Sequence, residues 1–218
     1  MMHRTNNIVL TITGASGGPY AVRLLDCLEA AGEMIHLVVS PHGQRLLTDE
    51  CGPKKGSEAF CAKHPSGCSG KRLLTPFFAL IGRRSERVIA YDYNDLSCRL
   101  ASGSFLTDGM VICPCSSNTL GAVAAGLGDN LITRAAHVTL KEGRPLVLVH
   151  REMPVTGIDL ENMLKLQRAG ATICPASPGF YLRPAKVADL VDFVVGRVLD
   201  LLGVPHQLNV RWEGGTGE

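Results

Sequence analysis

The sequence predicts an α/β protein with a doubly wound, mostly parallel sheet. Short apolar runs rich in β-branched residues alternate along the chain with stretches of helical periodicity. Glycine is abundant, at 24 residues, and aromatic residues make up only 5%, which is typical of folds with many tight strand-to-helix turns. Hydrophobic residues reach 45% and charged residues 19%, so the 218 residues carry enough apolar surface for one packed domain.

The first part of the chain begins with a complete strand, turn and helix. The run 8–12 is apolar and β-branched, and a glycine-rich turn follows it directly. Apolar residues then recur at helical spacing until Gly32 ends the helix: Val22, Leu24, Leu25, Leu28 and Ala31. A second strand at 35–39 and a short helix at 43–50 continue the pattern.

The second part of the chain repeats this alternation. Strands are predicted at 88–90, 109–113, 146–149 and 171–174. Helices are predicted at 130–140, 160–169 and 187–202, and a further helix of small residues follows the segment 114–119 and ends at 125. Because strands joined through helices pair in parallel with right-handed crossovers, we expect all these strands in a single sheet.

The segment 52–86 interrupts the alternation. It is rich in glycine and proline, carries several lysines and shows little periodicity, so we expect an irregular, exposed insertion. The predicted organisation is therefore one domain over 1–204, which contains this insertion, followed by a C-terminal tail over 205–218.

Charge and hydropathy exclude several classes of function. Lys+Arg total 22 against 20 for Asp+Glu, and a formal charge of +2 gives no electrostatic case for nucleic-acid binding. The chain shows neither an apolar run near the roughly 20 residues of a membrane span nor the features of a signal peptide. We therefore expect a cytoplasmic protein, with no membrane partner, whose eight cysteines are mostly free thiols.

Ligands of doubly wound sheets bind beyond the carboxyl ends of the strands. Four groups of residues follow predicted strands in this way: the turn 14–18, Ser40, the segment 116–119, and the pair Arg151–Glu152. These groups are the candidates for a binding site.

The turn 14–18 places backbone N–H groups at a helix N-terminus, where they can face an anion. Its glycines at 14, 17 and 18 do not match G-x-G-x-x-G, and Ser40 stands where a dinucleotide site wants an acid. The pattern argues against NAD and leaves a mononucleotide open. A tight turn that binds no ligand is the alternative.

The segment 116–119 is a second hydroxyl-rich strand-to-helix junction. It can grip a phosphate, or Ser116 or Ser117 can simply cap the helix. Two such junctions in one sheet favour a phosphate-bearing ligand more than either does alone. The pair Arg151–Glu152 follows a buried-looking strand, and such a pair can bind an anion and move a proton.

Metal and hydrolase chemistry are poorly supported. Cys61, His64 and Cys68 match no closed zinc pattern well, and a plain loop is the better interpretation. Cys113 and Cys115 lack the spacing of a redox pair. The histidines show no Ser or Cys partner that would indicate a catalytic triad.

Taken together, the sequence resembles the UbiX/Pad-type flavin prenyltransferases over roughly 8–50 and 87–204. The motifs that carry the resemblance include Thr-Gly-Ala-Ser-Gly at 13–17, Pro-Cys-Ser at 114–116, Arg-Glu-Met-Pro at 151–154 and Gly-Phe-Tyr-Leu-Arg-Pro at 179–184, with further matches at 39–40, 101–105, 108–112, 128–136 and 140–142. The insertion at 52–86 is not part of the family pattern.

The resemblance implies a flavodoxin-like variant of the Rossmann fold, assembled as a homododecamer with active sites at subunit junctions. It implies transfer of a dimethylallyl group to reduced FMN, which makes prenylated FMN for a UbiD-type decarboxylase. It implies no metal.

The resemblance also assigns roles to residues. FMN is held by Ala15, Ser16, Gly17, Ser40, Ser116, Ser117, Asn118, Thr119 and Arg151. Dimethylallyl phosphate is held by Lys141, Tyr181 and Arg197, with Trp212 as an aromatic face over the prenyl group. The reacting centre is lined by Ser16, Arg134, Lys141 and Glu152.

Some alternatives stay open. Either Glu152 or the departed phosphate is the base that removes the flavin C6 proton, and the donor is a monophosphate or a diphosphate. A flavin-dependent Cys decarboxylase shares the fold and a similar segment at 114–119, but its catalytic His and substrate clamp have no match here. A non-catalytic FMN carrier, or a subunit of a decarboxylase complex, is the third possibility.

Overall fold

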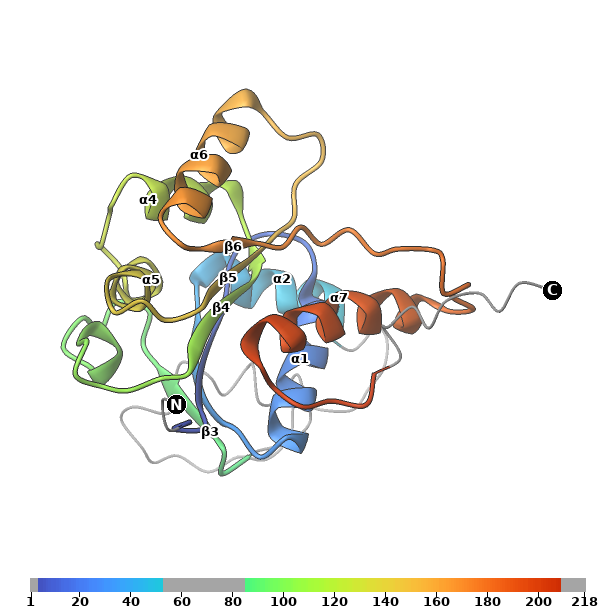
Figure 1. Ribbon diagram of the computed structural model, residues 1–218, viewed down its shortest axis with the longest axis horizontal. Helices are drawn as coiled ribbons and strands as arrows, with labels where there is room; N and C mark the ends of the chain where they lie inside the picture. Colours follow the sequence, from blue (N-terminus) through green and yellow to red (C-terminus); the bar gives the residue numbers. More distant parts are fainter. Residues whose placement is uncertain (1–3, 53–84, 209–218) are drawn as a thin grey trace.

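The computed structural model describes residues 4–52 and 85–208, and its centre is a sheet of six parallel strands (Figure 1). The strand order is β3-β2-β1-β4-β5-β6. The strands are β1 (Asn7–Ile12), β2 (Met34–Val39), β3 (Val88–Tyr91), β4 (Gly109–Cys115), β5 (Leu146–His150) and β6 (Thr172–Ile173). The predicted doubly wound parallel sheet is confirmed, and its order reverses between β1 and β4.

Helices cover both faces of the sheet (Figure 1). One face carries α1 (Gly18–Ala30), α2 (Pro41–Cys51) and α7 (Val187–Leu202), and the other carries α4 (Ser117–Ala124), α5 (Leu131–Lys141) and α6 (Gly157–Arg168). Strand residues alternate between the two layers, so that Leu10 packs with the first group while Val9 packs with the second. In the described ranges, no helix has the length and apolarity to cross a membrane.

Side-chain caps fix where the helices begin. Ser40, Ser116, Asn130 and Thr156 each accept a hydrogen bond from a backbone N–H in the first turn of α2, α4, α5 and α6. This capping explains two differences from the predicted boundaries. The helix α6 begins at Gly157, three residues before the expected start, because Thr156 caps it. The helix α2 begins at Pro41, two residues early, because Ser40 caps it and proline suits a first helical position.

Part of the sequence-based expectations lies outside the described residues. The insertion expected at 52–86 falls there almost entirely, with Cys61, His64 and Cys68, and so does Trp212 in the predicted tail.

Candidate active site

The turns that follow β1 and β4 form one hydrogen-bonded unit at the point where the strand order reverses. The Thr13 hydroxyl donates to the Pro114 carbonyl oxygen at 2.8 Å and accepts from the Ser116 N–H at 2.9 Å. The Thr13 N–H also donates to the Pro114 carbonyl, at 3.2 Å. The two predicted junctions therefore lie side by side in the crevice where doubly wound sheets bind ligands.

At the first junction, the N-terminus of α1 is occupied by a carboxylate of the chain itself. Glu50 Oε2 accepts from the N–H groups of Gly17 and Gly18 at 2.9 and 2.7 Å. Burial alone would raise the pKa of Glu50, but hydrogen bonds from Gly17, Ser16 and Gly18 and the charge of Arg151 bring that pKa below its ordinary value. An ionised carboxylate of the chain thus accepts hydrogen bonds from the same amides that the sequence predicts for binding a ligand anion.

Glu50 is not among the residues that the sequence predicts for the site. It lies near the end of α2, and its contact with the turn depends on how α2 packs against α1. No local motif encodes that packing angle, so no sequence signal marks the residue.

The close approach of α2 to the first turn explains two glycines. A Cβ on Gly14 would lie 2.6 Å from His42 Cβ, so only glycine fits there. Gly17 has φ of 133°, in the region that favours glycine. The hydroxyl of Ser40 accepts from the Gly43 N–H at 3.0 Å and so caps α2 beside this turn.

At the second junction, Ser116 and Ser117 have different partners. The Ser116 hydroxyl accepts from the Thr119 N–H at 3.3 Å and lies 3.1 Å from the Thr119 hydroxyl. The Ser117 hydroxyl lies 3.1 Å from His150 Nε2 and also hydrogen-bonds Asp159. Because a carboxylate only accepts, Ser117 donates its single proton to Asp159 and accepts from His150. Ser117 can therefore offer a ligand its backbone N–H but not its hydroxyl proton.

The burial of His150 supports this direction of donation. Burial lowers the pKa of His150, and Arg151 acts in the same direction against the opposing effects of Asp159 and Glu152. The imidazole is consequently neutral, with its proton on Nε2, and the hydrogen bonds run from His150 through Ser117 to Asp159. This chain of bonds ties the end of β5 to the first turns of α4 and α6.

The end of β5 brings charge to the same edge. Arg151 Nε donates to the Ser16 carbonyl oxygen at 3.0 Å, which links β5 to the first junction. Glu152 is exposed and its Oε1 accepts from the Met153 N–H at 3.2 Å. The edge therefore combines a cation fixed against the Ser16 turn with a carboxylate that faces solvent.

Tyr181 and Arg197 lie along α7. The Tyr181 ring packs edge-on against Phe193, with ring centroids 5.5 Å apart. Arg197 lies one helical turn beyond Phe193 and pairs with Asp200 at 2.8 Å. The Arg197 charge also acts on Cys174, just after β6, where it opposes the rise in pKa that burial produces. An aromatic group and a half-exposed cation thus share the α7 side of the molecule.

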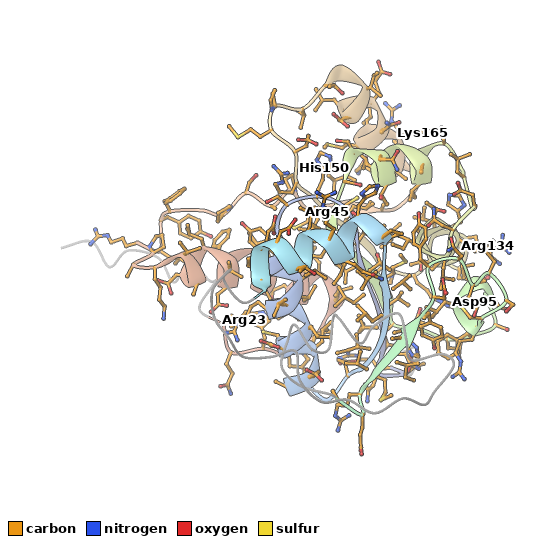
Figure 2. The ribbon with its side chains drawn as sticks, turned by 180° about the vertical axis from the view of Figure 1, so that it is seen from behind. Arg23, Arg45, Asp95, Arg134, His150 and Lys165 are labelled. Atoms are coloured by element: carbon orange, nitrogen blue, oxygen red, sulfur yellow. The ribbon has the colours of Figure 1, made fainter. Side chains whose placement is uncertain are left out.

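Arg134 and Lys141 lie apart from these groups. Figure 2 shows Arg134 on the α5 side of the molecule, apart from His150 at the end of β5. Arg134 Nε donates to the Ala101 carbonyl at 3.3 Å, and Lys141 pairs with Glu142 at 2.8 Å near Gly103. Since α5 leads into the start of β5, Lys141 lies toward the opposite edge of the sheet from the two junctions. Within one protomer the predicted residues thus separate into an edge group and an α5 group.

In the part of the chain that the structure describes, no group of three or more His, Cys, Asp or Glu side chains is placed to hold a metal ion. The edge instead offers hydroxyls, helix-terminal amides and a guanidinium. These donors suit a phosphorylated organic ligand.

Comparison with known proteins connects this arrangement to a family. The Flavoprotein family matches residues 1–199. The flavin prenyltransferase UbiX of Pseudomonas aeruginosa is 44% identical over 97% of this chain and 96% of its own length. The chain belongs to the flavin prenyltransferase UbiX family.

Solved structures agree with this membership. AnUbiX (PadA1), crystallised in complex with FMN and dimethylallyl pyrophosphate, superposes with a TM-score of 0.78 at 36% identity, covering 98% of this chain and all of the other. A dodecameric FMN-dependent UbiX-like decarboxylase from Escherichia coli O157:H7 superposes with a TM-score of 0.77 at 39% identity, covering 95% of this chain and 99% of the other. The family resemblance expected from the motifs is confirmed.

Proposed function

We propose that this protein is a flavin prenyltransferase, which transfers a dimethylallyl group from dimethylallyl phosphate to N5 and C6 of reduced FMN. The observation that carries the proposal is the hydrogen-bonded edge where β1, β4 and β5 end, with Ser16, Ser116 and Arg151 in one cluster. AnUbiX, a family member with the same fold, binds FMN together with dimethylallyl pyrophosphate.

The donors at this edge fit the phosphate of FMN. Glu50 already holds the α1 amides, so the phosphate is assigned to the second junction. There the Ser116 hydroxyl, the Ser117 and Asn118 N–H groups and the Thr119 hydroxyl are assigned to the phosphate. The Thr119 N–H is left out because it is already donated to the Ser116 hydroxyl. Arg151 lies next to this junction, where its N–H donates to the Cys115 carbonyl oxygen. The rest of the cofactor is assigned to the first junction and to Ser40, along Ala15, Ser16 and Gly17.

Reduced FMN supplies the nucleophilic N5 and C6 positions when it is bound. For the donor, the bond between its allylic carbon and the phosphate oxygen breaks, and the phosphate leaves with the electron pair. Cationic side chains that grip the phosphate favour this departure, and the role is assigned to Arg197 and Lys141, with Tyr181 as a hydroxyl donor. Trp212, outside the described residues, is assigned as the aromatic face beside the positive carbon.

The N5 proton leaves as the first bond forms at the allylic carbon. For the second bond, the prenyl double bond takes up a proton, its substituted carbon becomes the electrophile that bonds flavin C6, and a proton leaves C6. Glu152, a solvent-facing carboxylate beside Arg151, is assigned as its acceptor, and the departed phosphate is the competing base. If Glu152 is the base, a variant without its carboxylate should form prenylated FMN more slowly. If the phosphate is the base, that variant should keep the full rate.

The separation between the edge group and α5 supports an assembled site. We assign Arg134 and Lys141 to a site completed by a neighbouring copy, because within one chain both lie away from the edge. The dodecameric structure of the E. coli family member supports such an assembly.

The product is assigned to a UbiD-type decarboxylase, which would use prenylated FMN. The described cysteines are free thiols, which suits a reducing compartment such as the cytoplasm. Neither assignment changes the chemistry proposed for the site.

The decisive experiment mixes the purified protein with reduced FMN and dimethylallyl phosphate under anaerobic conditions. Mass spectrometry of the released flavin should show FMN enlarged by one C5H8 unit, with phosphate formed in equal amount. Binding of FMN without any change in its mass would indicate a carrier. In a separate incubation with oxidised FMN and a peptide that ends in cysteine, loss of CO2 from that cysteine with reduction of the flavin would indicate the decarboxylase alternative.

A further inference from the structure

The last turn of α7 contains a shared carboxylate. Asp200 Oδ2 accepts from Arg197 Nη1 at 2.8 Å, and Asp200 Oδ1 accepts from His206 Nε2 at 3.2 Å. Arg197 and Asp200 are three residues apart on the helix, so they are neighbours on its surface. His206 lies beyond the helix, and its side chain is only 6% exposed. One carboxylate therefore joins a solvent-facing cation to a buried ring.

The His206 ring fixes the direction of its bond to Asp200. His206 Nδ1 accepts from the Leu208 N–H at 3.2 Å. A nitrogen that accepts carries no proton, so the proton of the neutral ring is on Nε2 and is donated to Asp200. The carboxylate is thus held in place by a buried group and, through the Leu208 amide, by the first residues of the chain segment that leads toward Trp212.

The exposed side of this arrangement is the Arg197 guanidinium. Its side chain is 51% exposed, and among the described residues its one hydrogen bond is with Asp200. A bond through Nη1 leaves the Nε and Nη2 edge of the planar group available for an anion. An arginine side chain is long and flexible, and fixing it before a ligand arrives removes part of the entropy lost on binding.

We propose that Asp200 is a positioning residue that orients Arg197 toward the phosphate of the prenyl donor, and that His206 anchors Asp200. The inference rests on the proposed function, because Arg197 is assigned to the donor there. It goes further by giving a role to two residues that do not touch the donor. It also links the start of the C-terminal segment to the donor site.

Charge and orientation predict opposite effects for Asp200. A carboxylate 2.8 Å from the guanidinium partly neutralises it, so if charge alone mattered, removal of Asp200 would strengthen anion binding. If orientation dominates, removal weakens binding. We expect orientation to dominate, because Arg197 is half exposed and water screens the charge effect.

The test measures dimethylallyl phosphate binding to the full chain loaded with FMN, by titration calorimetry, together with steady-state kinetics. Asp200→Ala should raise both the Kd and the KM of the donor about threefold to tenfold, with kcat and FMN affinity unchanged. Asp200→Asn, which keeps the shape and one acceptor, should give a smaller rise and serves if the alanine variant fails to fold. The matched control is Asp192→Asn, which breaks another Arg–Asp pair of α7, with Arg23, and should leave the donor Kd unchanged.

A double-mutant cycle tests whether Asp200 acts through Arg197. In an Arg197→Ala background, Asp200→Ala should have no further effect on the donor Kd. His206→Leu should raise the donor Kd by part of the Asp200→Ala effect. His206→Gln keeps an N–H donor near the position of Nε2, so its donor Kd should return to the wild-type value. An unchanged or lower donor Kd in both Asp200 variants, or the same rise without Arg197, would overturn the inference. Failure of the proposed function is separate, since it would appear as wild-type protein that forms no prenylated flavin.

Discussion

The two strand-to-helix junctions at the edge of the sheet look alike in sequence but differ in their partners. The turn after β1 gives the amides of Gly17 and Gly18 to Glu50, which comes from a different helix. The turn after β4 is capped by its own Ser116. Both are small-residue turns at helix N-termini, yet among the described contacts only the first has a carboxylate of the chain that accepts from the helix-terminal amides.

This difference assigns different tasks to two similar motifs. A helix N-terminus favours negative charge, and a carboxylate already bound there competes with a ligand phosphate. The second junction has no acidic side chain among the described contacts of its Ser116 cap, so it remains suited to a phosphate. The first junction is then suited to contact the uncharged part of the ligand rather than to bind an anion.

Among single substitutions, the largest loss of activity is expected at Glu152, which lies outside both junctions. Glu152→Gln should slow formation of prenylated FMN by about 100-fold, the usual contribution of a positioned proton acceptor, with FMN affinity unchanged. Single-turnover assays under anaerobic conditions measure the rate. Full-rate product formation in this variant would assign proton removal to the departed phosphate and would leave the junctions as binding elements only.

The next largest effect is expected at Arg151, which links the first junction to β5. Arg151→Ala removes a cation and its bond to the Ser16 carbonyl, and loss of one charge-assisted contact should weaken FMN binding by about 30-fold. Fluorescence titration with FMN measures this. Arg45→Ala, a change of equal charge at an 82% exposed side chain on α2, is the control and should leave FMN affinity unchanged (Figure 2). Equal losses in both variants would mean that overall charge, rather than the edge, attracts FMN.

The third prediction compares the adjacent serines of the second junction. Ser116→Ala removes the hydroxyl assigned to the phosphate and should weaken FMN binding by about tenfold. Ser117→Ala should leave FMN affinity unchanged, because that hydroxyl proton goes to Asp159, although loss of a partner for buried His150 should lower the melting temperature. Similar losses of FMN affinity in the two variants would contradict the assignment of the phosphate to Ser116.

These serines show how far the sequence could be used. Alternation of strands and helices predicted the sheet, and the rule for doubly wound folds placed Ser16, Ser116 and Arg151 at one edge, where the structure has them. Local patterns could not separate Ser116 from Ser117, since the difference depends on His150 and Asp159, which come from later elements. The contact of Glu50 with the first junction could not be predicted either, because it also depends on the packing of elements that are distant in the sequence. The same holds for the separation of α5 from the edge.

The smallest effect is expected at Glu50, and it concerns stability and its dependence on pH. The pKa of Glu50 lies below its ordinary value in the folded protein. The carboxylate therefore stabilises the fold at pH values above about 4.5, the ordinary pKa of a glutamate, and this contribution disappears as the pH falls through the lower pKa of the folded state. Glu50→Gln keeps an acceptor for the two amides but loses the charge, and it should lower the free energy of unfolding by about 1 kcal/mol at pH 7.

Denaturant unfolding of both proteins between pH 7 and pH 3 tests this, with Asp49→Asn, at the neighbouring and more exposed position of α2, as the control. The difference between wild type and Glu50→Gln should shrink toward zero at acidic pH, because the wild-type carboxyl is then neutral as well. A difference that stays constant with pH would show that the charge of Glu50 does not hold the first junction, and the contrast between the two junctions would then rest on shape alone.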